Sequence, residues 1–210
     1  MSFTPDAEFP IINIEKGAIK GTLKKNRTAK GSLLSLKAGV AVNAVPQKAV
    51  MEFSTLSEEE FKLAKDAVEK ECGVRLERSG NTVTVIGVSA HASTPHLGKN
   101  AGLAALNFAV KLPSLSAEDK EAFEAILKLF PYGVTDGSGL GIKMNDEESG
   151  DLTCTLDLFA VDNKEMSFTF DSRVPICGNK ANCEDVARKS SEAKGFVFET
   201  NGMIPPHHVP

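Results

Sequence analysis

The sequence has few cysteines, and their positions exclude two common roles. The four thiols are Cys72, Cys154, Cys177 and Cys183 in a chain of 210 residues. A small secreted domain stapled by disulfides needs a higher density of cysteine, and a structural zinc knuckle needs closely spaced pairs. We therefore expect reduced thiols, most of them buried.

Long apolar runs and a strong charge of one sign are also missing. No run of about eighteen apolar residues occurs, and the start, MSFTPDAEF, lacks a basic segment leading into an apolar run, so neither membrane insertion nor export is predicted. The formal charge of −4 lacks the basic footprint of non-specific nucleic-acid binding. We expect a cytoplasmic protein that binds neither membranes nor nucleic acid.

Helices and strands alternate in the remaining pattern. Ser57 and Glu60 form the sequence of a capping box, and the apolar residues that follow at helical spacing end at Gly73, which predicts a helix over 57–72. Further helices are predicted over 100–112, over about 116–129 and from Asn179 or Asn182 to Gly195. Alternating apolar residues predict short strands before residue 53, a hairpin around 79–81, strands over 152–161 and 166–174, and a closing strand in FVFET.

This order of elements predicts an α+β fold of two ferredoxin-like (βαββαβ) subdomains. Each is expected to be an antiparallel sheet with helices on one face. Residues 31–113 would form the first subdomain and residues 114–204 the second.

His91 is the first candidate functional residue. It lies in GVSAHASTPHLGKNA, between a β-branched run and the start of a predicted helix, where glycines let a backbone approach a ligand closely. An imidazole in such a loop can donate a hydrogen bond to a developing oxyanion. The alternative is an ordinary solvated histidine.

Asn43 and Arg173 are weaker candidates when each is taken alone. Asn43 precedes Pro46 by three residues, which suits a turn as well as a ligand contact. Arg173 ends the alternating run MSFTFDSR, where its guanidinium could clamp a carboxylate or form a pair with Asp171. Asp6 lies near the start of the chain, and two histidines, 207 and 208, lie in a proline-rich end.

Six segments together resemble the zinc dipeptidases of the peptidase V type, within the aminoacylase and glutamate carboxypeptidase superfamily. The resemblance runs nearly from end to end of the chain. The segments are TPDAEFPIINIEKG (4–17), VNAVP (42–46), GVSAHASTPHLGKNA (87–101), SGDLTCTLDLF (149–159), FDSRVP (170–175) and PPHHVP (205–210).

The resemblance implies a lid. In such enzymes a catalytic domain carries two zinc ions, and a lid of two ferredoxin-like units closes over the dipeptide substrate. By this resemblance, His91 binds the scissile carbonyl oxygen as it becomes an oxyanion, Asn43 and Arg173 hold the substrate's terminal carboxylate or backbone, and Asp6 ligates one zinc. Residues 1–30 would then contain the junction from the catalytic domain and the first strands, and residues 205–210 the junction back to it.

Most of the family's zinc ligands have no counterpart in this chain. The H-x-D pair, the bridging aspartate, the glutamate base and the last zinc histidine are missing, and none of the four histidines precedes an x-Asp. A hydrolytic zinc site needs about three protein ligands per ion. We therefore expect the chain to be a piece of a longer enzyme, by excision or natural truncation, to hold no cofactor alone and to be inactive without its partner, the catalytic domain.

Two other interpretations stay open at this point. One is a stand-alone ferredoxin-like module for interaction or dimerisation, which would also lack a metal centre. The other is a metal-binding protein built on His207, His208 and the cysteines, although these residues lack the spacing of a tetrahedral site.

Overall fold

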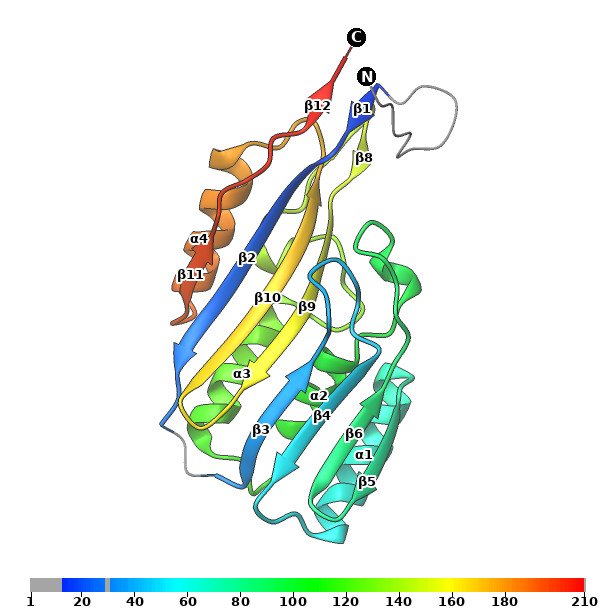
Figure 1. The fold of residues 1–210 in the computed structure, drawn as a ribbon, viewed down its shortest axis with the longest axis vertical. Coiled ribbons are helices and arrows are strands. Elements are labelled where there is room, and N and C mark those ends of the chain that lie inside the picture. Colours follow the sequence, from blue (N-terminus) through cyan, green and yellow to red (C-terminus); the bar gives the residue numbers. More distant parts are fainter. Residues whose placement is uncertain (1–12, 29–30, 210) are drawn as a thin grey trace, which may run out of the picture.

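The computed structural model describes residues 13–28 and 31–209, and most of the strands it contains form one antiparallel sheet. The eight strands lie in the order β11-β2-β10-β9-β3-β4-β6-β5 (Figure 1). They are β2 (Gly17–Asn26), β3 (Leu33–Ala38), β4 (Lys48–Phe53), β5 (Arg75–Ser79), β6 (Thr82–Ile86), β9 (Thr153–Val161), β10 (Glu165–Val174) and β11 (Val197–Thr200). Two short pairs lie outside this sheet: β1 (Ile14–Glu15) with β12 (His207–His208), and β7 (Asn145–Asp146) with β8 (Gly150–Asp151).

Helices cover one face of this sheet. They are α1 (Glu58–Cys72), α2 (Ala101–Ala109), α3 (Ala117–Leu129) and α4 (Asp185–Glu192), and α1, α2 and α3 lie behind the strands in Figure 1. The predicted helix over 57–72 is confirmed, because the Ser57 side chain accepts from the Glu60 N–H and Gly73 ends the helix with φ of 63°. The α+β class with antiparallel strands is confirmed as well.

The sheet consists of two units, one inserted into the other. We call β2, α3, β9, β10, α4 and β11 the outer unit, and β3, β4, α1, β5, β6 and α2 the inner unit, which lies in the chain between β2 and α3. The outer unit has the strand order β11-β2-β10-β9 and the inner unit β3-β4-β6-β5. Both orders are compatible with a ferredoxin-like unit, although in the inner unit the edge strand β3 comes first in the chain rather than last.

Pairing between β3 and β9 joins the two units into a continuous sheet. Leu36 pairs with Val161 and Ala38 with Phe159. β2 pairs with β10 along its whole length, so residues 17–26 belong with the last third of the chain.

The core lies between the sheet and the helices. α2, with the sequence AGLAALNFA, is buried on nearly all sides and lies between α1 and α3. A Cβ on Gly102 would lie 2.3 Å from the Phe159 ring, so glycine allows α2 to approach the sheet closely. Phe108 of α2 meets Phe53 and Phe61 edge-on, with ring centroids 6.5 and 5.9 Å away.

One buried ion pair of the outer unit also bonds to the start of β3 in the inner unit. The Arg27 guanidinium donates to both carboxylate oxygens of Asp119 at 2.8 Å. It also donates to the carbonyls of Leu33, Leu34 and Asp162 at 2.6, 3.2 and 2.7 Å. The side chains of both charged residues are 2% exposed or less, so their charges are satisfied entirely inside the protein.

Two expectations from composition can also be compared with the structure. All four cysteines are free, and three of them are buried while Cys177 is exposed. None of the helices in residues 13–28 and 31–209 combines the length and the apolar character needed to cross a membrane.

Candidate functional site

Two loops meet at one end of the inner unit and bring Asn43 and His91 together. His91 forms an antiparallel bridge with Ala44, in the loop between β3 and β4. Next to this bridge, the Ala92 N–H donates to the Asn43 carbonyl at 2.9 Å. The two candidate residues, 48 positions apart in the chain by subtraction of their numbers, are therefore neighbours in space.

The His91 ring is exposed and has a defined hydrogen-bonding partner. Its Nδ1 accepts from the Ser93 N–H at 3.2 Å and lies 2.8 Å from the Ser93 hydroxyl. A neutral imidazole that accepts at Nδ1 carries its proton on Nε2. The ring can therefore present an Nε2–H donor to a ligand.

Arg173 is connected to the same loops through β9. Its cross-strand partner is Thr153, and the Thr153 hydroxyl donates to the Ala92 carbonyl at 2.8 Å. Ala92 follows His91 directly and bonds to Asn43, so Asn43, His91 and Arg173 belong to one connected group.

The Arg173 guanidinium forms a pair with Asp171. Its Nε lies 2.8 Å from one carboxylate oxygen of Asp171 and its Nη2 lies 3.3 Å from the other. The Asp171 side chain is fully buried, while that of Arg173 is 29% exposed. The Nη1 of Arg173 has no hydrogen bond to any described residue. One edge of the guanidinium can therefore still donate hydrogen bonds to an anionic ligand.

Asp157 is a further acidic residue of this region that the sequence analysis missed. It occupies a bulge in β9, where Leu158 pairs with Thr169 and Leu156 pairs with Phe170. Its side chain is fully buried, and neither carboxylate oxygen has a hydrogen-bond partner among the described residues. Burial, and then the charge of Asp171, raises the pKa of Asp157 to about 8.

The loop between β3 and β4 lies directly over this bulge. A Cβ on Gly39 would lie 1.8 Å from the Asp157 carbonyl oxygen, and Gly39 has a φ of 82°. Only glycine fits this close approach and this backbone conformation. A signal was present in the sequence, because Asp157 interrupts the apolar run TCTLDLFAV of a strand that is buried on both faces.

The described residues do not fit a zinc centre. Asp6, the predicted zinc ligand, lies outside them. Within 13–28 and 31–209, no three His, Cys, Asp or Glu side chains lie close enough together to hold a metal ion. At the chain end, His208 Nδ1 lies 3.5 Å from a Glu148 oxygen, and no cysteine joins them.

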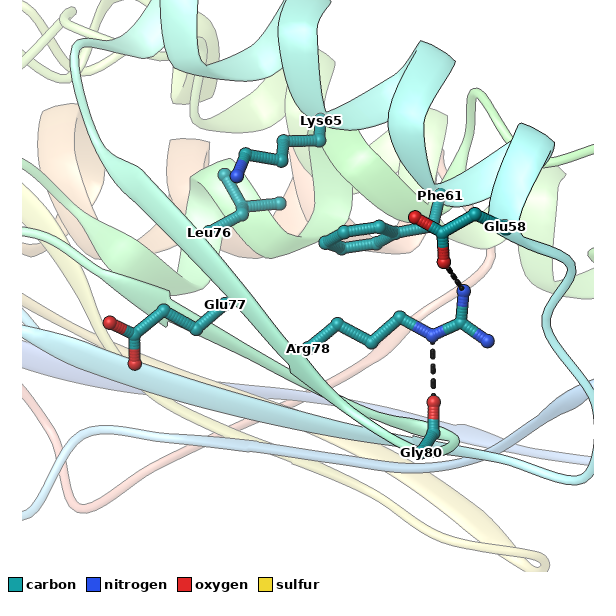
Figure 2. A pocket seen from close by; sticks show the side chains of 7 residues that line it. All are labelled: Glu58, Phe61, Lys65, Leu76, Glu77, Arg78 and Gly80. Carbon is teal, nitrogen blue, oxygen red and sulfur yellow. Dashed lines mark hydrogen bonds and ion pairs between the residues drawn. The ribbon is translucent and has the colours of Figure 1, made fainter.

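An open groove of about 760 Å³ lies between α1 and β5 (Figure 2). It lies at the opposite end of β6 from the His91 loop. Arg78 in its floor donates to Glu58 at 2.9 Å and to the Gly80 carbonyl at 2.7 Å, and its guanidinium lies 5.5 Å from the centre of the Phe61 ring. Arg78 and Glu58 neutralise each other. The groove is open and lined largely by charged side chains, so it lacks the apolar, enclosed lining of a small-molecule site.

Comparison with known proteins shows which family the chain resembles. Residues 78–170 match the family model of the peptidase dimerisation domain, M20_dimer. Over these residues the chain is similar to the dimerisation domains of M20 peptidases. The resemblance to dipeptidases drawn from the sequence motifs is thereby confirmed.

Two similar relatives are longer than this chain. Putative dipeptidases of Staphylococcus aureus strains bovine RF122 and MRSA252 are each 28% identical over 222 residues, covering 100% of this chain and 47% of the relative. The chain therefore spans about half the length of the curated relatives it matches. Among solved structures, the aminoacylhistidine dipeptidase of Vibrio alginolyticus aligns with a TM-score of 0.43 and 11% identity, covering 94% of this chain and 46% of that one.

Proposed function

We propose that this chain is the substrate-binding lid of a zinc-dependent dipeptidase whose catalytic domain lies elsewhere in the longer protein. The observation that carries the proposal is the connected group of Asn43, His91 and Arg173, in which Ala92 bonds to both Asn43 and Thr153. Three polar residues from three separate segments are thus linked at one end of the sheet, in a chain that is similar to putative dipeptidases.

Each of the three side chains suits one part of a dipeptide. The His91 Nε2–H would donate to the carbonyl oxygen of the scissile bond as negative charge develops on it. Such a donor acts most strongly in a closed site without water, where it stabilises the transition state more than the bound substrate. The free edge of Arg173 would clamp the terminal carboxylate, and the Asn43 amide would hold the substrate backbone.

Zinc would be bound by the catalytic domain, and Asp6 is the one ligand that we assign to this chain. Since the described residues do not supply a metal centre, the isolated chain should not hydrolyse dipeptides even with added zinc, cobalt or manganese. Robust turnover by the isolated chain would contradict the proposal.

The decisive experiment uses the full-length enzyme that contains this lid. We expect His91→Ala to lower kcat about 100-fold or more with little change in KM, the size found for other oxyanion donors. Arg173→Ala should instead raise KM for dipeptides with a free C-terminus, and less for those with an amidated one. His96→Ala, an exposed histidine on the same loop, is the matched control. Equal and small effects of all three changes would contradict the assignments.

A second candidate function is self-association, which the description of the matching family as a dimerisation domain favours. The sheet ends at β5 and β11, whose outer edges have no partner strand within the described residues. Sedimentation of the isolated chain separates the two functions: a defined dimer supports a dimerisation module, whereas a monomer together with the kinetic effects above supports a lid.

A further inference from the structure

Asp157 has no part in the proposed function, and its surroundings are unusual for a carboxyl group. It is a fully buried carboxyl group in the bulge of β9, without a hydrogen-bond partner among the described residues. An isolated buried carboxylate without a partner is costly, and proteins usually avoid the cost by keeping the group neutral. A neutral carboxyl group is therefore the form that fits this bulge.

The neighbours of Asp157 make its charge important. Asp171 pairs across the strands with Thr155, two residues before Asp157, and its own carboxylate is fully buried. That carboxylate accepts two hydrogen bonds from the Arg173 guanidinium. With Asp157 neutral, the group of Asp157, Asp171 and Arg173 has no net charge, and with Asp157 ionised it has a net charge of −1.

We propose that Asp157 is a positioning residue that keeps a proton beside the Asp171–Arg173 pair, so that one negative charge, not two, faces the guanidinium. Arg173 then keeps enough positive character to attract a carboxylate at its free edge. This last step rests on the proposed function, whereas the proton on Asp157 and its effect on Arg173 do not.

The strands and the loop around Asp157 offer few other titratable groups that could set the charge beside Arg173. β10 contributes Asp171 and Arg173, and β9 contributes the buried Cys154 thiol, whose pKa burial raises well above its usual value. Lys20 of β2 lies across from Asp171, and its side chain is exposed. The loop over the bulge, residues 39–46, contains no titratable side chain.

The test is an NMR titration of the isolated chain labelled at the aspartate carboxyl carbons and arginine Nε. In the wild type, we expect the Asp157 carboxyl resonance to titrate near pH 8, the value to which its pKa is raised. The Arg173 Nε–H resonance should shift with the same midpoint. Asp157→Asn, which imitates the neutral form, should abolish that step in the Arg173 resonance, and Asp66→Asn on the exposed face of α1 should leave it unchanged.

Two results would overturn the inference. One is an Asp157 resonance that titrates in the ordinary acidic range, around its unperturbed value of 3.8. The other is an Arg173 resonance with the same pH profile in the wild type and in Asp157→Asn. The first result is read from the wild type alone, so it remains decisive even if the variant fails to fold.

The wild type also offers a stability measurement. The native state binds the Asp157 proton more tightly than the unfolded chain, so this contribution to stability is fully present below pH 3.8 and is lost as the pH rises to about 8. The urea midpoint of the wild type should therefore fall more steeply over this window than that of Asp157→Asn. Identical slopes would overturn the inference.

The outcomes also separate this inference from the proposed function. If Arg173 responds to Asp157 but Arg173→Ala leaves KM unchanged in the full-length enzyme, the lid role fails and the proton-holding role stands. If KM rises in Arg173→Ala but Arg173 does not respond to Asp157, the lid role stands and this inference fails.

Discussion

Two arginine–aspartate pairs in this protein have the same chemistry and different surroundings. Both aspartates, Asp119 and Asp171, are fully buried and are bonded by two guanidinium nitrogens. Arg27 is buried as well and also bonds to three backbone carbonyls. Arg173 is 29% exposed and keeps one nitrogen without a bond to the described residues.

The difference shows how to distinguish a structural ion pair from one that is available for binding. Around Arg27 every donor is used, so the pair can only hold β2, β3 and α3 in place. Around Arg173 three N–H donors, two on Nη1 and one on Nη2, have no bond to the described residues, and a second carboxyl group, Asp157, lies close by. Incomplete satisfaction at a partly exposed site is thus the feature that marks a candidate ligand contact.

Arg27→Met should have the largest effect on stability. It leaves a buried carboxylate and three carbonyls without their donor, and breaking such a pair costs about 3–5 kcal/mol. Urea unfolding followed by circular dichroism measures the loss. The double change Arg27→Met with Asp119→Leu removes both charges, so it should recover much of the stability. A loss below about 1 kcal/mol in the single variant would contradict a structural role.

Arg173→Met should cost less, about 2 kcal/mol, the usual penalty for leaving one buried polar group unsatisfied. Arg173 is 29% exposed, so solvent screening already weakens this pair. The same urea experiment measures it. A loss of unfolding free energy as large as that of Arg27→Met would contradict the distinction between a structural ion pair and one that is available for binding.

Thr153→Val should cost about 1 kcal/mol, since it removes the hydrogen bond from the Thr153 hydroxyl to the Ala92 carbonyl. The more specific result is local. Amide hydrogen exchange should become faster at Ala92 and Thr94, whose N–H groups hold the His91 loop. Thr84→Val on β6 is the control and should leave exchange in this loop unchanged.

Arg75→Met should have the smallest effect, within about 0.5 kcal/mol of the wild type. Arg75 lies 2.8 Å from Glu77, but these side chains are 67% and 54% exposed. The unfolding midpoint should scarcely move. A loss comparable with that of Arg173→Met would mean that exposure does not rank the ion pairs of this protein.

The local elements were predictable because their signals lie within a few residues. Ser57, Glu60 and Gly73 define both ends of α1, and the hairpin around Gly80 follows from its alternating flanks. The continuous sheet was not predictable in this way. The pairing of β3 with β9, and of β2 with β10, joins strands more than 100 residues apart, and no local pattern specifies it.

The site was predictable only as separate residues. Asn43, His91 and Arg173 could be chosen as candidates, and their roles stay predictions. Their connection through Thr153 depends on strand register and is absent from the sequence pattern. Asp157 carried a visible signal, an acidic residue inside an apolar strand, but its burial depends on the bulge and on the close approach of residue 39.

The insertion of the inner unit into the outer unit has a consequence for synthesis of the chain. The inner unit occupies one continuous stretch, so its four strands and two helices can assemble as soon as residue 109 has left the ribosome. β2 cannot pair with a neighbouring strand until β10 has been synthesised, about 140 residues later by the register of the two strands. During that interval β2 is an unpaired strand in a nascent chain, which is the kind of segment that chaperones protect.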